Sequence, residues 1–243
     1  MILDIYKDAL EYASIDGESL IKLGVISFLN FLIIPIFLQL GYSYRTCKIA
    51  VNGMINGDDK LANFSDLISM FVDGLKVFTL KFIYIILPVT IGLILIMAGS
   101  NYGGVIGGFI IFLGVIISII LGAIGAFIST IAISHMAANG DSLKEAFNIK
   151  ELFTIAESIG YLRVIGFYIG IIMIMFAITL MVLIILITVF SIFGITTSFI
   201  SPFVGSSILT TGFIIMELIF SLIVVPFLTI FEARSIGLLY NLR

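Results

Sequence analysis

The chain has 243 residues, of which 61% are hydrophobic and 11% charged, and its formal net charge is -3. A typical soluble domain carries about 25% charged residues, so the composition excludes a soluble enzyme and a disordered protein, and the lack of a basic surface excludes a nucleic-acid partner. It favours an all-α integral membrane protein. A single cysteine and a single histidine, Cys47 and His135, exclude an internal disulfide, a cysteine metal cluster and a multi-histidine metal site.

The first predicted segment, residues 1–55, combines an amphipathic start with a short apolar stretch at 23–44. Asn30 and Pro35 fit poorly in a straight lipid-facing helix, because the proline frees a backbone carbonyl that then needs a partner. Two interpretations stay open. The favoured one is a re-entrant or shallow hairpin turning near residues 30–35, and the other is a single crossing, which makes five crossings in all.

Two long stretches without any charge, residues 82–134 and 164–216, follow later in the chain. Each has 53 residues, and a helical span needs about 20, so each predicts two spans joined by a turn. Residues 99–104 form the first predicted turn and residues 194–207 the second. The last span is then expected at about 208–231.

The chain also predicts an internal repeat, with boundaries at 56–138 and 139–243. An Asn-Gly-Asp sequence starts each unit, at Asn56 and at Asn139, and an amphipathic segment and a charge-free hairpin follow. The apolar residues of each segment fall on one helical face, which is typical of a helix lying at the membrane surface or packed under the bundle. These residues are Phe64, Leu67, Ile68, Phe71 and Leu75 in the first segment and Ile149, Leu152, Phe153, Ala156 and Ile159 in the second. The predicted fold is therefore five to six hydrophobic segments, arranged as tandem repeats of an interfacial helix plus a transmembrane hairpin.

The basic residues predict the orientation. All loops on one side of the predicted hairpins carry lysine and arginine, whereas the two turns on the other side carry none. The positive-inside rule then places the charged loops and the C-terminus in the cytoplasm of a multi-pass protein of the cell membrane. The basic residues concerned are Arg45, Lys48, Lys60, Lys76, Lys81, Lys144, Lys150, Arg163, Arg234 and Arg243.

Small residues recur at helical spacing along the second predicted helix of the first hairpin. Such residues let helix backbones approach closely, which drives association inside a bilayer. We expect this stripe to pack within the chain, with a homodimer interface as the alternative. Its members are Gly103, Gly107, Gly114, Ser118 and Gly122.

Glu217 is the one acidic residue predicted well inside a span, and no basic residue of the neighbouring apolar stretches can pair with it. Acids in such positions often serve as cation or proton sites, although a neutral glutamic acid bonded to nearby hydroxyl groups is also consistent. His135, at the end of a span, is expected to be solvated or to cap the helix. No spacing indicates a catalytic, metal or cofactor site.

Residues 40–45 (LGYSYR), 64–66 (FSD) and 71–76 (FVDGLK), with Tyr84 and Pro88 after them, resemble a prokaryotic, largely archaeal membrane family, domain of unknown function number 4013. Two positions depart from the family pattern, where Ala62 replaces a usual proline and Leu67 a common tryptophan. The resemblance implies a polytopic membrane protein and supplies no activity. The residues of the motif that we take as a candidate structural site are Gly41, Tyr42, Arg45, Asp66, Asp73 and Gly74.

Charge and shared side suggest a role for this motif. Arg45 and Lys48 leave the preceding helix on the side where Asp66 and Asp73 lie two turns apart. An Arg45–Asp73 or a Lys48–Asp66 ion pair is therefore expected to hold the amphipathic helix beneath the bundle.

Three functions remain compatible with the sequence. The favoured one is a non-enzymatic structural or accessory membrane component, with the lipid bilayer as its surroundings and a membrane protein or a second copy as a further partner. The alternative is a small transporter or channel that uses buried Glu217, although few polar residues are available to line a path. An intramembrane enzyme acting on lipid ranks last, because no set of residues offers complementary catalytic roles.

Overall fold

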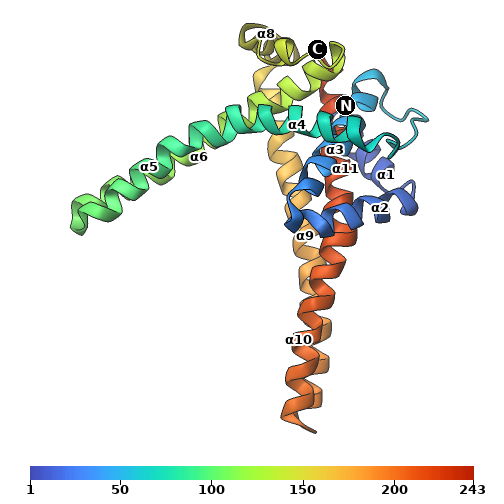
Figure 1. Cartoon of the computed structure of the whole chain (residues 1–243), viewed down its shortest axis with the longest axis vertical. Helices are drawn as coiled ribbons and strands as arrows, with labels where there is room; N and C mark the ends of the chain where they lie inside the picture. Colours follow the sequence, from blue (N-terminus) through green and yellow to red (C-terminus); the bar gives the residue numbers. More distant parts are fainter.

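The computed structural model describes residues 1–243, which form helices and contain no strand. Figure 1 shows a helical body, holding both chain ends, from which two helical hairpins diverge. We call the body the cap (residues 1–86, 125–171 and 220–243) and the projecting hairpins arm 1 (residues 87–124) and arm 2 (residues 172–219).

The chain passes from the cap into arm 1, back through the cap into arm 2, and ends in the cap. In chain order they are α1 (Ile2–Ala13), α2 (Gly17–Phe28), the 3-10 turn η1 (Leu29–Leu32), α3 (Ile34–Asn52), α4 (Leu67–Lys81), the π-helical turn η2 (Phe82–Ile86), α5 (Leu87–Tyr102), α6 (Gly104–Ala138), α7 (Leu143–Ala146), α8 (Ile149–Ile159), α9 (Tyr161–Ser198), α10 (Pro202–Ile219), the π-helical turn η3 (Phe220–Val224) and α11 (Val225–Tyr240).

Four helical stretches are long and apolar enough to cross a membrane: Leu67–Tyr102, Gly104–Ala138, Tyr161–Ser198 and Pro202–Tyr240. The expected count of five to six hydrophobic segments is therefore not confirmed. Residues 23–44 do not form one long helix, because η1 interrupts them and Ile33 takes a positive φ of 68°. The chain turns there, within the stretch where Asn30 and Pro35 predict a turn.

The two hairpins differ from the expected boundaries in one respect. The first turns at Gly103, inside the predicted turn, but α9 continues through Thr196 and Thr197 to Ser198. The last helical stretch consequently begins at Pro202 and not near residue 208. The hydroxyl groups of Thr196 and Thr197 donate to the carbonyls of Ile192 and Phe193, at 2.6 and 2.7 Å, so these polar residues stay within the helix.

The amphipathic segments also behave differently from each other. In α8 the predicted apolar face is largely the buried one, through Leu152, Ala156 and Ile159. In α4 the buried residues are Met70, Gly74, Val77 and Leu80, whereas the predicted stripe at Leu67, Ile68 and Leu75 is exposed. The reason is that Gly74 sets the contact with α3, and α4 runs on through η2 into α5 as part of one continuous rod.

Two helical stretches join each arm to the cap, and one of the two, α4–η2–α5 in arm 1 and α10–η3–α11 in arm 2, contains a π-helical turn with a proline shortly after it. Pro88 and Pro226 lack the N–H that would bond to the carbonyl four residues earlier, on Tyr84 and Leu222, and a π-helical turn surrounds each of these residues. A glycine of another helix packs directly against each freed carbonyl oxygen. A Cβ on Gly125 would overlap the oxygen of Tyr84, and a Cβ on Gly24 would overlap the oxygen of Leu222. One connection of each arm to the cap thus has a proline whose freed carbonyl lies against a glycine.

Candidate functional site: the ion-paired cap

Arg234 is the most deeply buried charge of the cap. Its side chain on α11 is fully buried, its Nε donates to Asp8 of α1 at 2.8 Å, and its Nη1 donates to Asp59 of the α3–α4 loop at 2.7 Å. The guanidinium carbon also lies 4.5 Å from the ring centre of Tyr12, and burial raises the pKa of Tyr12 to about 12. This cluster joins the first and last helices of the chain to the α3–α4 loop.

Asp141 is the centre of a second cluster. Lys48 Nζ donates to both carboxylate oxygens of Asp141, at 2.8 and 2.7 Å, and the hydroxyl of Tyr44 donates at 2.6 Å. Burial alone would raise the pKa of Asp141, but the hydrogen bonds from Lys48 and Tyr44 hold it below its ordinary value. The loop before α7 is thereby fixed to α3.

The motif at residues 41–74 lies at the crossing of α3 and α4. A Cβ on Gly41 would overlap the carbonyl oxygen of Met70, and one on Gly74 that of Phe37, so the two backbones are in direct contact. Tyr42 is fully buried and stacks on Phe64, with ring centres 4.5 Å apart. The candidate structural residues are thus brought together at one crossing.

Of the two expected ion pairs, one forms. Arg45 Nε lies 3.7 Å from Asp73, and its other nitrogens donate to the backbone carbonyls of Asn63, Ser65 and Asp66. The Lys48–Asp66 pair does not form. Lys48 binds Asp141, and the Asp66 carboxylate accepts from the backbone N–H of Ser69 at 3.1 Å, which caps the start of α4.

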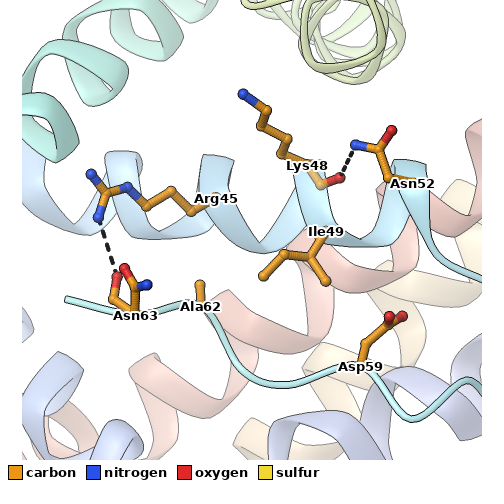
Figure 2. Close-up of a pocket in the computed structure, with 7 residues that line it drawn as sticks. All are labelled: Arg45, Lys48, Ile49, Asn52, Asp59, Ala62 and Asn63. Atoms are coloured by element: carbon orange, nitrogen blue, oxygen red, sulfur yellow. Dashed lines mark hydrogen bonds between the residues drawn. The ribbon is translucent and has the colours of Figure 1, made fainter. Parts of the chain in front are cut away.

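An open pocket of about 470 Å³ lies between α3 and the loop that follows it. Figure 2 shows its lining residues, with Lys48 extending away from Asp59 and Arg45 donating to Asn63. The charges of the lining are already paired, since Lys48 binds Asp141, Arg45 contacts Asp73, and Asp59 binds Arg234. The pocket therefore offers amide groups and no unpaired charge. Its lining is Arg45, Lys48, Ile49, Asn52, Asp59, Ala62 and Asn63.

The residues of the predicted small-residue stripe all lie in arm 1, but they have different neighbours. Gly107 faces the backbone of Gly99, Gly114 faces Gly92, and the Ser118 hydroxyl lies against Gly92. A Cβ on Gly122 would lie 3.4 Å from a methyl group of Val89, whereas Gly103 forms the turn with a positive φ of 66° and has no neighbour at its Cβ position. Within the single chain the stripe faces α5.

Glu217 is exposed on α10, and neither a hydrogen bond nor an ion pair engages its carboxylate. This differs from the expectation of an acid buried in the bundle. The physical reason is that α10 packs only against α9 along most of its length, through Gly205 and Gly212. His135 also departs from expectation, because it is only 2% exposed and bonds to Tyr240.

The buried ion pairs around Arg234 and Asp141 were not predicted from the sequence. Asp8 and Asp59 have no distinguishing spacing, and their partner Arg234 is far away in the chain. Asp141 belongs to the second Asn-Gly-Asp sequence, but that repeat indicated a unit boundary and gave no ion-pair partner. One signal was available for Arg234, which lies within the apolar run that ends the chain, since a charge inside such a run demands a partner.

Comparison with known families gives one match. Residues 26–185 match the model of a family described as a protein of unknown function, DUF4013. The chain belongs to the DUF4013 family. The part matched by the DUF4013 model includes the α3–α4 crossing, arm 1 and Asp141, whereas Asp8 and Arg234 lie outside it. No curated protein and no solved structure matches the chain.

Proposed function

We propose that this DUF4013 protein is a non-enzymatic structural or accessory component of the membrane, in which two glycine-packed arms anchor an ion-paired cap. The observation that carries the proposal is the composition of the buried positions in the arms. In arm 1 they are Gly92, Gly99, Gly107 and Gly114, and in arm 2 Gly194, Gly205 and Gly212. Neither arm encloses a polar path for a solute.

The lengths of the arms support this role. At about 1.5 Å per residue, the 16 residues of α5 and the 18 residues of α10 extend roughly 24 and 27 Å, close to the ~30 Å hydrocarbon core of a bilayer. Glu217 then lies near the headgroup boundary on the cap side, where a carboxylate reaches water. Lipid is the partner that the exposed apolar faces fit, and a membrane protein or a second copy would replace lipid on the same faces.

The proposed orientation places the cap in the cytoplasm and the two turns outside, because the cap holds all twelve basic residues. Single-cysteine variants test this placement in a Cys47→Ser background. We expect Asn101→Cys and Ser201→Cys to react with a membrane-impermeant thiol reagent on intact cells. Lys60→Cys should react only after permeabilisation. The reverse pattern would overturn the orientation.

A flux measurement tests the absence of transport. Liposomes that contain the purified protein and a pH-sensitive dye are expected to leak protons and potassium no faster than protein-free vesicles. Glu217→Gln should leave the leak rate unchanged. A flux that requires the protein and is abolished by Glu217→Gln would overturn the proposal in favour of a small transporter or channel.

A further inference from the structure

A third polar cluster lies where α6 ends and the short helices α7 and α8 begin. His135 comes from α6, Glu145 from α7 and Glu151 from α8, and one ligand atom of each lies within 4.8 Å of those of the other two. The imidazole is buried, Glu145 is half-buried and Glu151 is exposed. The cluster therefore has a fixed inner side and an outer side open to water.

The histidine is oriented by a hydrogen bond on its far side. Nδ1 lies 2.7 Å from the hydroxyl of Tyr240, and Nε2 lies 3.6 Å from a carboxylate oxygen of Glu151. Asn139 approaches Nδ1 and Nε2 at 3.1 and 3.4 Å, but its amide also donates to the backbone carbonyl of His135 at 2.9 Å. An imidazole held through one nitrogen presents the other as a ligand, which is the usual arrangement of metal-binding histidines.

The carboxylates have few partners of their own. Asn148 donates to Glu151 at 2.9 Å, which fixes that side chain, and no protein group bonds to Glu145. The nearest basic residues in sequence, Lys144 and Lys150, are exposed and make no ion pair with either glutamate. Two carboxylates brought this close repel each other unless a cation lies between them.

We propose that His135, Glu145 and Glu151 form a binding site for a divalent transition-metal cation such as Zn²⁺. One imidazole nitrogen and two carboxylate oxygens are a ligand set that zinc accepts, and three protein ligands leave a position for water. Mg²⁺ and Ca²⁺ prefer sites built from oxygen alone, so the imidazole selects against them. The ion would tie α7 and α8 to the end of α6.

The test is equilibrium dialysis of the full-length protein against Zn²⁺, in detergent, after removal of any affinity tag and stripping with a chelator. We expect one bound Zn²⁺ per chain, a higher Tm with Zn²⁺ than without, and no equivalent effect of Mg²⁺. Glu145→Gln and Glu151→Gln should each weaken Zn²⁺ binding by about tenfold or more.

The control variant is Glu157→Gln, which removes an exposed carboxylate from the same helix α8. It should bind Zn²⁺ as the unaltered protein does. All three substituted side chains are at least partly solvent-accessible, so the variants are expected to fold, and the Tm without metal checks this. The proposal is overturned if no Zn²⁺ binds in a saturable way, if Glu145→Gln and Glu151→Gln bind as well as Glu157→Gln, or if Mg²⁺ binds equally tightly.

Discussion

The cap and the arms are held together by opposite means. The largest fully buried side chains all belong to the cap and include Arg234, Tyr42, Tyr44 and Phe167. In the arms, by contrast, every buried position is a glycine. The cap therefore depends on side chains that fill space and pair charges, whereas each arm depends on backbones that approach each other where no side chain intervenes.

This difference fits the proposed placement of the arms in lipid and of the cap in water. The polar side chains of the cap lose water on folding, so each buried charge needs a partner. Between helices that lipid surrounds there is no hydrophobic driving force, and close backbone packing replaces it. Substitutions should consequently act through lost pairing in the cap and through added volume in the arms.

The largest loss of stability is expected for Arg234→Met in the cap. The variant leaves the buried carboxylate of Asp8 with the backbone N–H of Asn56 but without its ion-pair partner, and removing one member of a buried pair costs about 3–5 kcal/mol. The free energy of unfolding in detergent measures this loss. Arg163→Ala removes an exposed arginine and should change it by no more than about 0.5 kcal/mol.

A second substitution shows whether the loss comes from the stranded charge. Combining Arg234→Met with Asp8→Leu removes both charges and should recover part of the stability. If Arg234→Met costs less than about 1 kcal/mol, which is the range of exposed pairs, the cluster does not organise the cap.

The next effect concerns arm 1 and compares two adjacent glycines. A Cβ on Gly107 would overlap the carbonyl oxygen of Gly99, so Gly107→Ala should push α5 and α6 apart at a cost of about 1–3 kcal/mol. Nothing lies near the Cβ position of Gly108, and Gly108→Ala should be neutral or stabilise the helix by up to about 1 kcal/mol. Unfolding in detergent compares both variants, and equal losses would refute a backbone contact at Gly107.

Much of the arms could be predicted from the sequence. The charge-free stretches mark both hairpins because lipid excludes charge, and the turn at Gly103 lies where Gly-Ser-Asn residues cluster. The end of α9 was misplaced because serine and threonine signal a turn in water. Inside an apolar helix Thr197 bonds to the carbonyl of Phe193, four residues earlier, and the helix continues.

The cap was much harder to predict. Asp8 and Arg234 are separated by 226 positions, and no local pattern links them. The Arg45–Asp73 pair was within reach because its two helices are consecutive and cross at Gly41 and Gly74. The buried face of α4 could not be predicted, because the glycine contact with α3 places Met70 inside and leaves the more apolar stripe exposed.

A smaller effect is expected at Asp141, and it depends on pH. Because the folded-state pKa is below the ordinary value of 3.8, the stabilisation from Lys48 and Tyr44 is present in full above that value and is lost as the pH falls through the lower folded pKa. Asp141→Asn should cost about 1–2 kcal/mol at pH 7. Thermal unfolding at pH 7 and near pH 3 measures the difference from the unaltered protein, which should shrink in acid. A difference that is constant with pH would contradict the charge as its cause.

The smallest effect is expected for Asp73→Asn. The Arg45–Asp73 contact is long at 3.7 Å, and pairs of this kind contribute about 0–1 kcal/mol. Arg45 itself also donates to three backbone carbonyls of the loop before α4, so Arg45→Ala should cost more, about 1.5–3 kcal/mol. Unfolding in detergent ranks the two variants. If Asp73→Asn costs as much as Arg45→Ala, the ion pair holds α4 in place. The geometry instead predicts that Arg45 acts mainly by binding the loop carbonyls. The α3–α4 crossing then depends on backbone contacts even within the cap.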